Sequence, residues 1–245
     1  MTENDEDLFD DGDDDLDLTL YADSRELASE VVAQALIEIE KGLGENETFN
    51  LVLTGGSLGI LISQGLLDVW NSRLDDFLGL NIWWSDERFV SEKSDERNAA
   101  PLHGKVINKN IIVHEVLASD VAASVGEAVN HYINELEDVI LNLNILGLGP
   151  DGHVASLFPG QANLDDMRRV IAVTDSPKPP AVRVSFTMAA INNCEDVWIV
   201  AAGAGKAQAV TQIFEGDLSI PASYVRGNRQ TRLIVDTEAF FAEST

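Results

Sequence analysis

The sequence predicts a single α/β domain with a mainly parallel β-sheet and helices on both faces. From residue 17 onward, short apolar or alternating segments typical of strands are separated by segments of helical length and spacing, a pattern that indicates parallel strands joined by crossover helices. The length of 245 residues suits one such domain, which can bury roughly 70–75% of the surface of its unfolded chain. No repeat of fixed period and no clear linker interrupts the pattern.

The first half of this domain begins with an alternating strand at 17–22 and a helix at 24–43. Asp23 or Ser24 offers an N-cap for this helix, and Glu26 lies in its first turn. Apolar runs predict the next strands, and apolar residues repeated every three to four positions predict helices. In order, these are a strand at 49–56, a helix at 57–70, strands at 79–84 and 111–117, and a helix at 120–139.

The second half begins with the strand that has the strongest pattern, residues 141–149, which is apolar on both faces at its end. The remaining elements follow from the same two kinds of spacing. They are strands at 169–174 and 181–186, a short helix at 187–194, a strand at 196–203, a helix at 206–216 and a last strand at 231–236.

The charge of the chain excludes several classes of partner. Its 42 acidic and 16 basic residues give a net charge of −26. Ten of the acids and none of the bases lie within residues 1–17, which leaves 32 acids against 16 bases in the other 228 residues. This balance argues against nucleic acid and against anionic membrane surfaces. A single cysteine, Cys194, excludes an internal disulfide and a cysteine metal cluster.

The acidic residues 1–16 are expected to be a disordered tail, because a low-complexity segment with so much like charge does not fold by itself. We therefore assign the domain to residues 17–245. The N-terminal residues show no basic region followed by an apolar stretch, and no apolar run is long enough to span a bilayer. These features predict a soluble cytoplasmic protein.

Ligands of such sheets bind at the carboxyl ends of the strands, so the residues after each strand are candidates for a site. Four segments qualify, and we expect them to meet at one rim. They are 54–57, 85–88, 147–153 and 202–206.

Two of these segments could bind an anion. Thr54, Gly55, Gly56 and Ser57 join an apolar strand to a helix, where glycines let backbone N–H groups approach a phosphate and the helix N-terminus adds partial positive charge. The alternative is a turn that needs glycine only for its geometry, since neither a P-loop nor a dinucleotide fingerprint is present. Lys206 lies in a first helical turn, which the helix dipole disfavours, and phosphate binding would explain that position.

The segment after the two tryptophans carries Asp86 and Arg88. Arg88 could bind a phosphate or a carboxylate with its planar donors, and Asp86 could act as a base or hold Arg88. Arg97 and Asn98 follow closely and could face the same cleft. The alternative is a surface cluster of ion pairs, which contributes little energy.

His153 differs from the other three histidines because it lies in a glycine-rich loop after a buried strand. An imidazole titrates near neutrality and suits a general base, and Asp151 could orient its ring. The alternative is a histidine that satisfies loop carbonyls. His103, His114 and His131 have positions typical of structural residues. The Gly-x-Ser-x-Gly motif of serine hydrolases is absent.

Taken together, these segments resemble the 6-phosphogluconolactonases, within the larger group that includes the glucosamine-6-phosphate deaminases. The matching motifs are LTGGS, WWSDERFV with ERNA after it, LGLGPDGHVASLFPG, KPPAVRVSFT and VAAGAGKAQAV, which occur in the family's order over residues 51–210. The resemblance implies a three-layer α/β/α sandwich with a Rossmann-like sheet. It also implies hydrolysis of 6-phospho-D-glucono-1,5-lactone to 6-phosphogluconate in the oxidative pentose phosphate pathway.

The resemblance assigns roles to the candidate residues. His153 would be the base that activates water, Asp151 would hold it, and Arg88 would stabilise the oxyanion, with Asp86 as a further catalytic candidate. The residues expected to bind the 6-phosphate are Thr54, Gly55, Gly56, Ser57 and Lys206, with Arg183 as a helper. The sugar-phosphate lactone is the small-molecule partner, and no metal or other cofactor is expected, because the ester is already reactive and no ligand set is apparent.

The sequence departs from the family at Val154, where threonine is usual, at Ser91, where proline is common, and at Ser85, where glycine is frequent. Two other functions stay open. A sugar-phosphate deaminase-isomerase would use Asp86 as a base, but the deaminases place an acid five residues after the histidine, where this chain has Phe158. A non-catalytic sugar-phosphate sensor would use the same pocket, but such regulators usually carry a DNA-binding module.

Overall fold

The computed structural model describes residues 16–161 and 164–241, so the expected tail lies outside the described residues except for Leu16. Seven parallel strands form the main sheet, in the order β1-β10-β9-β6-β2-β3-β5. They are β1 (Asp17–Tyr21), β2 (Phe49–Leu53), β3 (Leu80–Trp84), β5 (Ile111–Val113), β6 (Leu143–Gly147), β9 (Asp196–Ala201) and β10 (Gln230–Asp236).

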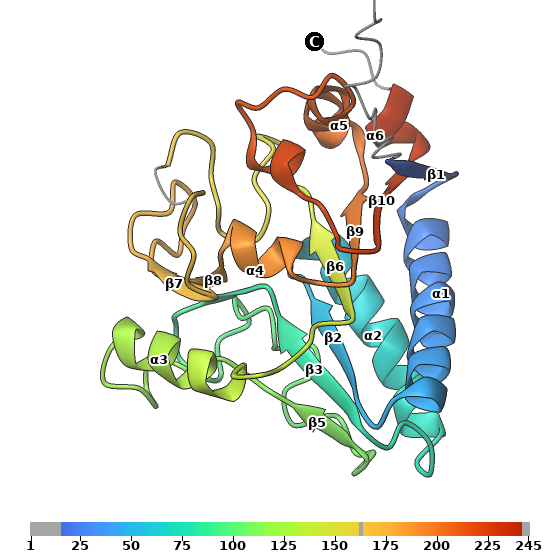
Figure 1. Cartoon of the computed structure of the whole chain (residues 1–245), viewed down its shortest axis with the longest axis vertical. Coiled ribbons are helices and arrows are strands. Elements are labelled where there is room, and N and C mark those ends of the chain that lie inside the picture. The colour runs from blue at the N-terminus through green and yellow to red at the C-terminus, as the bar shows by residue number, and fades with distance from the viewer. Residues whose placement is uncertain (1–15, 162–163, 242–245) are drawn as a thin grey trace, which may run out of the picture.

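Helices cover both faces of this sheet (Figure 1), which confirms the predicted sandwich with a mainly parallel sheet. They are α1 (Ser24–Glu45), α2 (Gly56–Ser72), α3 (Val125–Glu135), α4 (Met188–Asn192), α5 (Ala207–Phe214) and α6 (Thr237–Phe241), with 3-10 turns η1 (Ala204–Lys206) and η2 (Pro221–Tyr224). Among the described residues, none of the helices has the length and apolar character needed to cross a bilayer.

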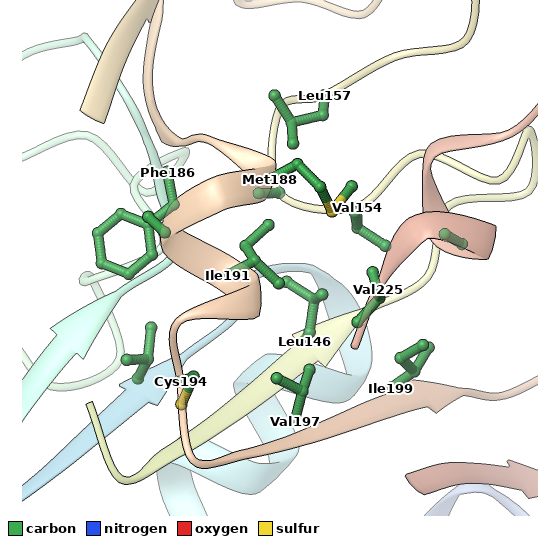
Figure 2. Close-up of a cluster of buried hydrophobic side chains, with 14 of the residues drawn as sticks. Leu146, Val154, Leu157, Phe186, Met188, Ile191, Cys194, Val197, Ile199 and Val225 are labelled. Atoms are coloured by element: carbon green, nitrogen blue, oxygen red, sulfur yellow. The ribbon is translucent and has the colours of Figure 1, made fainter. Parts of the chain in front are cut away.

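The buried apolar residues form one cluster on each face of the sheet. The cluster beneath α1 and α2 includes Leu27, Ile62 and Trp70. The other cluster joins α3, α4 and α5 to the sheet, and Figure 2 shows part of it around Met188 and Ile191. β2, β6 and β9 contribute side chains to both clusters, which explains why these strands are apolar on both faces.

Local sequence signals set the helix boundaries. The Asp23 side chain accepts hydrogen bonds from the backbone N–H groups of Arg25 and Glu26, as the N-cap prediction required. The predicted helix at 120–139 is shorter, because Ser124 caps it by accepting from the backbone N–H of Glu127 at 3.2 Å. The residues between 120 and 124 precede this cap and are not helical.

A second, antiparallel sheet was not predicted. β4 (Asp86–Arg88), β7 (Val170–Val173) and β8 (Arg183–Phe186) form it in the order β4-β8-β7. Only Ser85 separates β3 from β4, so the chain leaves the main sheet at this residue and pairs with β8 instead. β7 and β8 match strands predicted at 169–174 and 181–186, whereas β4 was expected to be a loop after the strand at 79–84. Alternation of apolar residues does not reveal which sheet a strand joins. This small sheet brings Asp86 and Arg183 to the carboxyl edge of the main sheet.

Candidate active site

The four strand-end segments meet in one pocket of about 260 Å³, just below the usual range for small-molecule sites. They follow β9, β6, β2 and β3, which are consecutive neighbours in the sheet. The order of the strands reverses between β6 and β2, and ligands of open parallel sheets bind at such a point. Of the residues given catalytic or phosphate-binding roles from the sequence, all but Asp151 line the pocket: Thr54, Gly55, Gly56, Ser57, Asp86, Arg88, His153, Arg183 and Lys206.

The glycine-rich turn after β2 packs closely against its neighbours. The backbone N–H of Gly147 donates to Thr54 Oγ1 at 3.1 Å. A Cβ atom on Gly55 would lie 1.8 Å from Asn98 Oδ1, so only glycine allows Asn98 to approach here. Among the described residues, no side chain caps the first turn of α2 at Gly55, which leaves the N–H groups of this turn and the positive end of the helix directed at the pocket.

His153 and Asp151 form a hydrogen-bonded pair beside this turn. His153 Nδ1 lies 2.5 Å from Asp151 Oδ1, so we assign the ring hydrogen to Nδ1. Within the described part of the chain, no group hydrogen-bonds to Nε2, which leaves this atom free to accept a proton. Burial lowers the pKa of His153, although the charge of Asp151 opposes this effect. The hydrogen bond to His153 helps to hold the pKa of Asp151 at about 2, so the pair combines a carboxylate with a neutral imidazole.

The loop between β6 and His153 needs its glycines for close approach. A Cβ atom on Gly149 would lie 1.9 Å from His153 Nδ1, and Gly152 has a φ of +77° and would meet Ile220. The next residue after the histidine, Val154, is fully buried among apolar side chains such as Met188 (Figure 2). The loop thus anchors its apolar residue in the core and directs the imidazole into the pocket.

Asp86 pairs with Arg183 rather than with Arg88, contrary to one of the two interpretations offered by the sequence. Its carboxylate lies 3.7 Å from Arg183 Nη1, accepts from Ser156 Oγ at 2.6 Å and accepts from Asn98 Nδ2 at 2.9 Å. Asp86 and Arg183 are 6% and 4% exposed, so the pair is buried. Its polar atoms are mostly engaged by the protein itself.

Arg88 is better placed to meet a ligand. Its Nη1 donates to the main-chain carbonyl of Glu96 at 2.6 Å, which fixes the side chain across the edge of the pocket. Its Nε is buried and has no partner among residues 16–161 and 164–241. Because this nitrogen is buried, a ligand would meet the part of the guanidinium that lines the pocket.

The expectation for Arg97 is wrong, whereas that for Asn98 holds. Arg97 lies away from the pocket, donates to the Val116 carbonyl at 2.6 Å and pairs with Glu87 at 3.6 Å. Asn98 does line the pocket. Glu87 accepts from the backbone N–H groups of Asn98 and Ala99 at 2.7 and 3.0 Å, and this contact decides which of the two adjacent side chains faces inward.

Lys178 also lines the pocket, although the sequence analysis did not single it out. Its Nζ lies 3.1 Å from Asp151 Oδ1 and 3.2 Å from His153 Nδ1. Lys178 is the first residue of the motif KPPAVRVSFT, so this motif was the signal in the sequence that could have pointed to it. Lys206 follows β9, in η1. Burial and the charge of Lys178 lower the pKa of Lys206.

The other three histidines make contacts typical of structural residues. His103 Nδ1 lies 2.9 Å from Glu115 Oε1, His114 stacks on a tryptophan of β3 with ring centroids 3.8 Å apart, and His131 forms an i,i+4 pair with Glu135. In the described ranges, no three His, Cys, Asp or Glu side chains come together in a group that could hold a metal ion.

The comparisons with known proteins agree with this geometry. Residues 22–234 match the family model described as glucosamine-6-phosphate isomerases/6-phosphogluconolactonase. The chain belongs to this family. A Streptomyces coelicolor member named 6-phosphogluconolactonase is 32% identical over 241 residues, which cover 91% of this chain and 92% of the relative. A Mycobacterium tuberculosis member of the same name is 34% identical over 208 residues, with 77% and 83% covered.

The fold is also similar to that of solved members of this family. The crystal structure of the Thermotoga maritima 6-phosphogluconolactonase superposes with a TM-score of 0.79 at 28% identity, covering 91% of this chain and all of the other. The resemblance noted in the motifs is therefore confirmed, as is the expectation that the chain is an enzyme of this family.

Proposed function

We propose that this enzyme hydrolyses 6-phospho-D-glucono-1,5-lactone to 6-phosphogluconate, with His153 as the base that activates water. The relatives that carry the name of this activity support the substrate class. The observation that carries the mechanism is the His153–Asp151 pair, whose open Nε2 lies in a pocket beside an uncapped helix N-terminus. A base and an anion site in one small pocket suit a reactive phosphorylated substrate.

The reaction proceeds in two steps. Neutral His153 takes a proton from water through Nε2 while the water oxygen bonds to the lactone carbonyl carbon, and the carbonyl oxygen gains the negative charge. The bond from this carbon to the ring oxygen then breaks as the oxyanion collapses, and the imidazolium returns its proton to the departing oxygen. The products are a carboxylic acid and a free hydroxyl group. Proton transfer of this kind typically contributes about 10²–10⁴ in rate.

Arg88 is the group that we assign to the developing oxyanion. Its guanidinium lines the pocket and is held in place by the Glu96 carbonyl, and a preorganised donor directed at an oxyanion is typically worth about 10²–10³ in rate. Asp86 has a positioning role in this scheme, because its carboxylate is held by Ser156, Asn98 and Arg183.

The 6-phosphate would bind at the first turn of α2, with Lys206 across the pocket. The residues from Thr54 to Ser57 line this end of the site, and the N–H groups at a helix start suit a phosphate. Lys206 is a lysine next to a second cation, Lys178, and an anion between them would relieve their repulsion. The guanidinium of Arg183 already donates to main-chain carbonyls, so Arg183 would attract the phosphate by its positive charge without donating a hydrogen bond to it.

The surroundings of His153 favour the lactonase over the deaminase. The resemblance places the acid of the deaminases at position 158, and here the ring of Phe158 packs against the imidazole with centroids 4.7 Å apart. An aromatic ring supplies no acidic group for opening a sugar ring. Among residues 16–161 and 164–241, the carboxylate that hydrogen-bonds to the ring is that of Asp151, at Nδ1.

The experiment that tests the proposal supplies the wild-type enzyme with freshly prepared 6-phosphogluconolactone and, separately, with glucosamine 6-phosphate. Acid release is followed in a pH-stat under cool, mildly acidic conditions, and ammonia release reports deamination. We expect rapid acid release from the lactone and no ammonia. Ammonia release would establish the deaminase, and binding of both compounds without turnover would establish a sensor; either result would refute the proposal.

A further inference from the structure

Lys178 stands where a cation can act on the catalytic pair. It lies on the segment between β7 and β8, which crosses the pocket from the small antiparallel sheet. Its Nζ is 3.1 Å from Asp151 Oδ1 and 3.2 Å from His153 Nδ1. Asp151 thus has a histidine and a lysine on the same carboxylate oxygen.

The main chain at Lys178 is fixed by buried groups. Its carbonyl accepts from Arg183 Nη2 at 2.9 Å and from Ser176 Oγ at 2.9 Å. Arg183 also donates through Nε to the Pro180 carbonyl at 3.0 Å and pairs with Asp86. The buried Asp86–Arg183 pair therefore holds the segment from 178 to 180, and the lysine amine reaches the catalytic pair from a fixed backbone position.

The hydrogen-bond geometry limits what this amine can do. Nδ1 of a neutral imidazole carries one hydrogen when it donates to Asp151, so Lys178 cannot also donate to that atom. Its own hydrogen goes to the carboxylate oxygen, and its charge remains next to the ring. The cation then opposes the effect of Asp151, which alone would favour an imidazolium.

Within the described ranges, three charged side chains act on the imidazole. Asp151 comes from the same loop, Lys178 from the segment after β7, and Asp86 from β4, while Phe158 covers one side of the ring. Asp151 and Asp86 raise the pKa of His153, and Lys178 lowers it, in addition to the larger effect of burial. Among the described residues, Lys178 is thus the one cation whose charge lowers the pKa of His153.

We propose that Lys178 is a positioning residue that shares the Asp151 carboxylate with His153 and keeps the imidazole in the neutral form that a base requires. This inference rests on the proposed function. Lys178 also makes the imidazolium formed in the first step a stronger acid, ready to protonate the departing ring oxygen. The buried Asp86–Arg183 pair serves the reaction through Lys178.

The test compares Lys178→Met with a matched control, Lys206→Met, which removes a second pocket lysine that donates to neither Asp151 nor His153. Two quantities are measured between about pH 5 and pH 8, the range in which histidine titrates. One is the titration of the His153 ring by NMR, with its signal assigned through its loss in His153→Gln. The other is the pH profile of kcat/KM with the lactone.

We expect Lys178→Met to raise the pKa of His153 by about one unit, the scale of a charge pair of this spacing in a partly exposed site. In the pH profile of kcat/KM, the decline on the acidic side moves to higher pH by the same amount. At acidic pH the variant's kcat/KM is therefore about tenfold below that of the wild type, and at alkaline pH it approaches the wild-type value. Lys178→Arg keeps the wild-type profile because it keeps the charge. Lys206→Met raises KM at every pH and leaves the decline on the acidic side in place.

Two results would overturn the inference: an unchanged ring titration in a folded Lys178→Met protein, or a rise in KM at every pH with no shift of the decline on the acidic side, which would make Lys178 a substrate-binding residue. The NMR titration needs no turnover. A wild-type protein that fails to hydrolyse the lactone while its ring pKa responds to Lys178→Met would therefore refute the proposed function and support the electrostatic role.

Discussion

Replacing Gly149 with alanine should displace the imidazole of His153 while leaving every charged group of the pocket in place. The added Cβ atom would lie 1.9 Å from Nδ1, 2.1 Å from Cε1 and 2.6 Å from Cγ, and these are the three heavy atoms nearest to it. Ordinary contact begins at 3.4 Å, so the ring must move by about 1.5 Å, or the loop must open by a similar amount. The 2.5 Å hydrogen bond to Asp151 does not survive such a shift unchanged.

The expected magnitude follows from this displacement. A misplacement of about 1 Å in a catalytic group can cost about 10²-fold in rate, and crowding of a packed site typically costs about 1–3 kcal/mol of stability. We therefore expect kcat/KM for the lactone to fall about a hundredfold. Urea unfolding should show a protein that is less stable but still folded.

Two controls show whether the effect passes through His153. Gly44→Ala, in α1, places its Cβ atom where no atom of the described residues lies within 4 Å, so activity should be unchanged and stability equal or raised by up to about 1 kcal/mol. In the double variant with His153→Ala, the ring that clashes is gone, so Gly149→Ala should cause no further loss. A folded Gly149→Ala enzyme with wild-type kcat/KM would refute this account of the loop.

The remaining predictions concern the base, the loop and the tail. Because burial lowers the pKa of His153 below its ordinary value of 6.5, kcat/KM should stay level as the pH falls through neutrality and decline only below about 6.5. A decline that begins above this pH would mean that a group other than His153 is the base. Asp151→Asn should reduce kcat by about 10²–10⁴-fold, since the amide no longer fixes the ring tautomer, and a loss confined to KM would contradict this. Val154→Thr restores the usual residue of the family but buries a hydroxyl among apolar side chains, so urea unfolding should show a loss of about 1–3 kcal/mol with kcat unchanged. Removing residues 1–15 should leave turnover intact, and a changed kcat would give the tail a role in the site.

The sequence predicted most of the main sheet because its signals are local. The Asp23 cap of α1 and the apolar run of β6 depend on residues next to each other in the chain. The shared location of the four strand-end segments also followed, since parallel strands of one sheet end at the same edge. The family motifs then supplied the roles that geometry alone leaves open.

Other features depend on contacts between distant residues and were missed for that reason. β4 joins β8 across 95 or more positions of the chain, so the second sheet and the Asp86–Arg183 pair were not predictable from spacing. The orientation of Arg97 and Asn98 is set by the buried carboxylate of Glu87. Lys178 reaches Asp151 only because the segment between β7 and β8 folds over the pocket.

The role of His153 as the base is tested by comparing wild type with His153→Ala in lactone hydrolysis, together with binding of 6-phosphogluconate by calorimetry. We expect kcat/KM to fall by about 10²–10⁴ while 6-phosphogluconate still binds, because the substitution leaves the proposed phosphate site at α2 and Lys206 unchanged. Undiminished hydrolysis by the folded His153→Ala protein would contradict the claim that this histidine is the base.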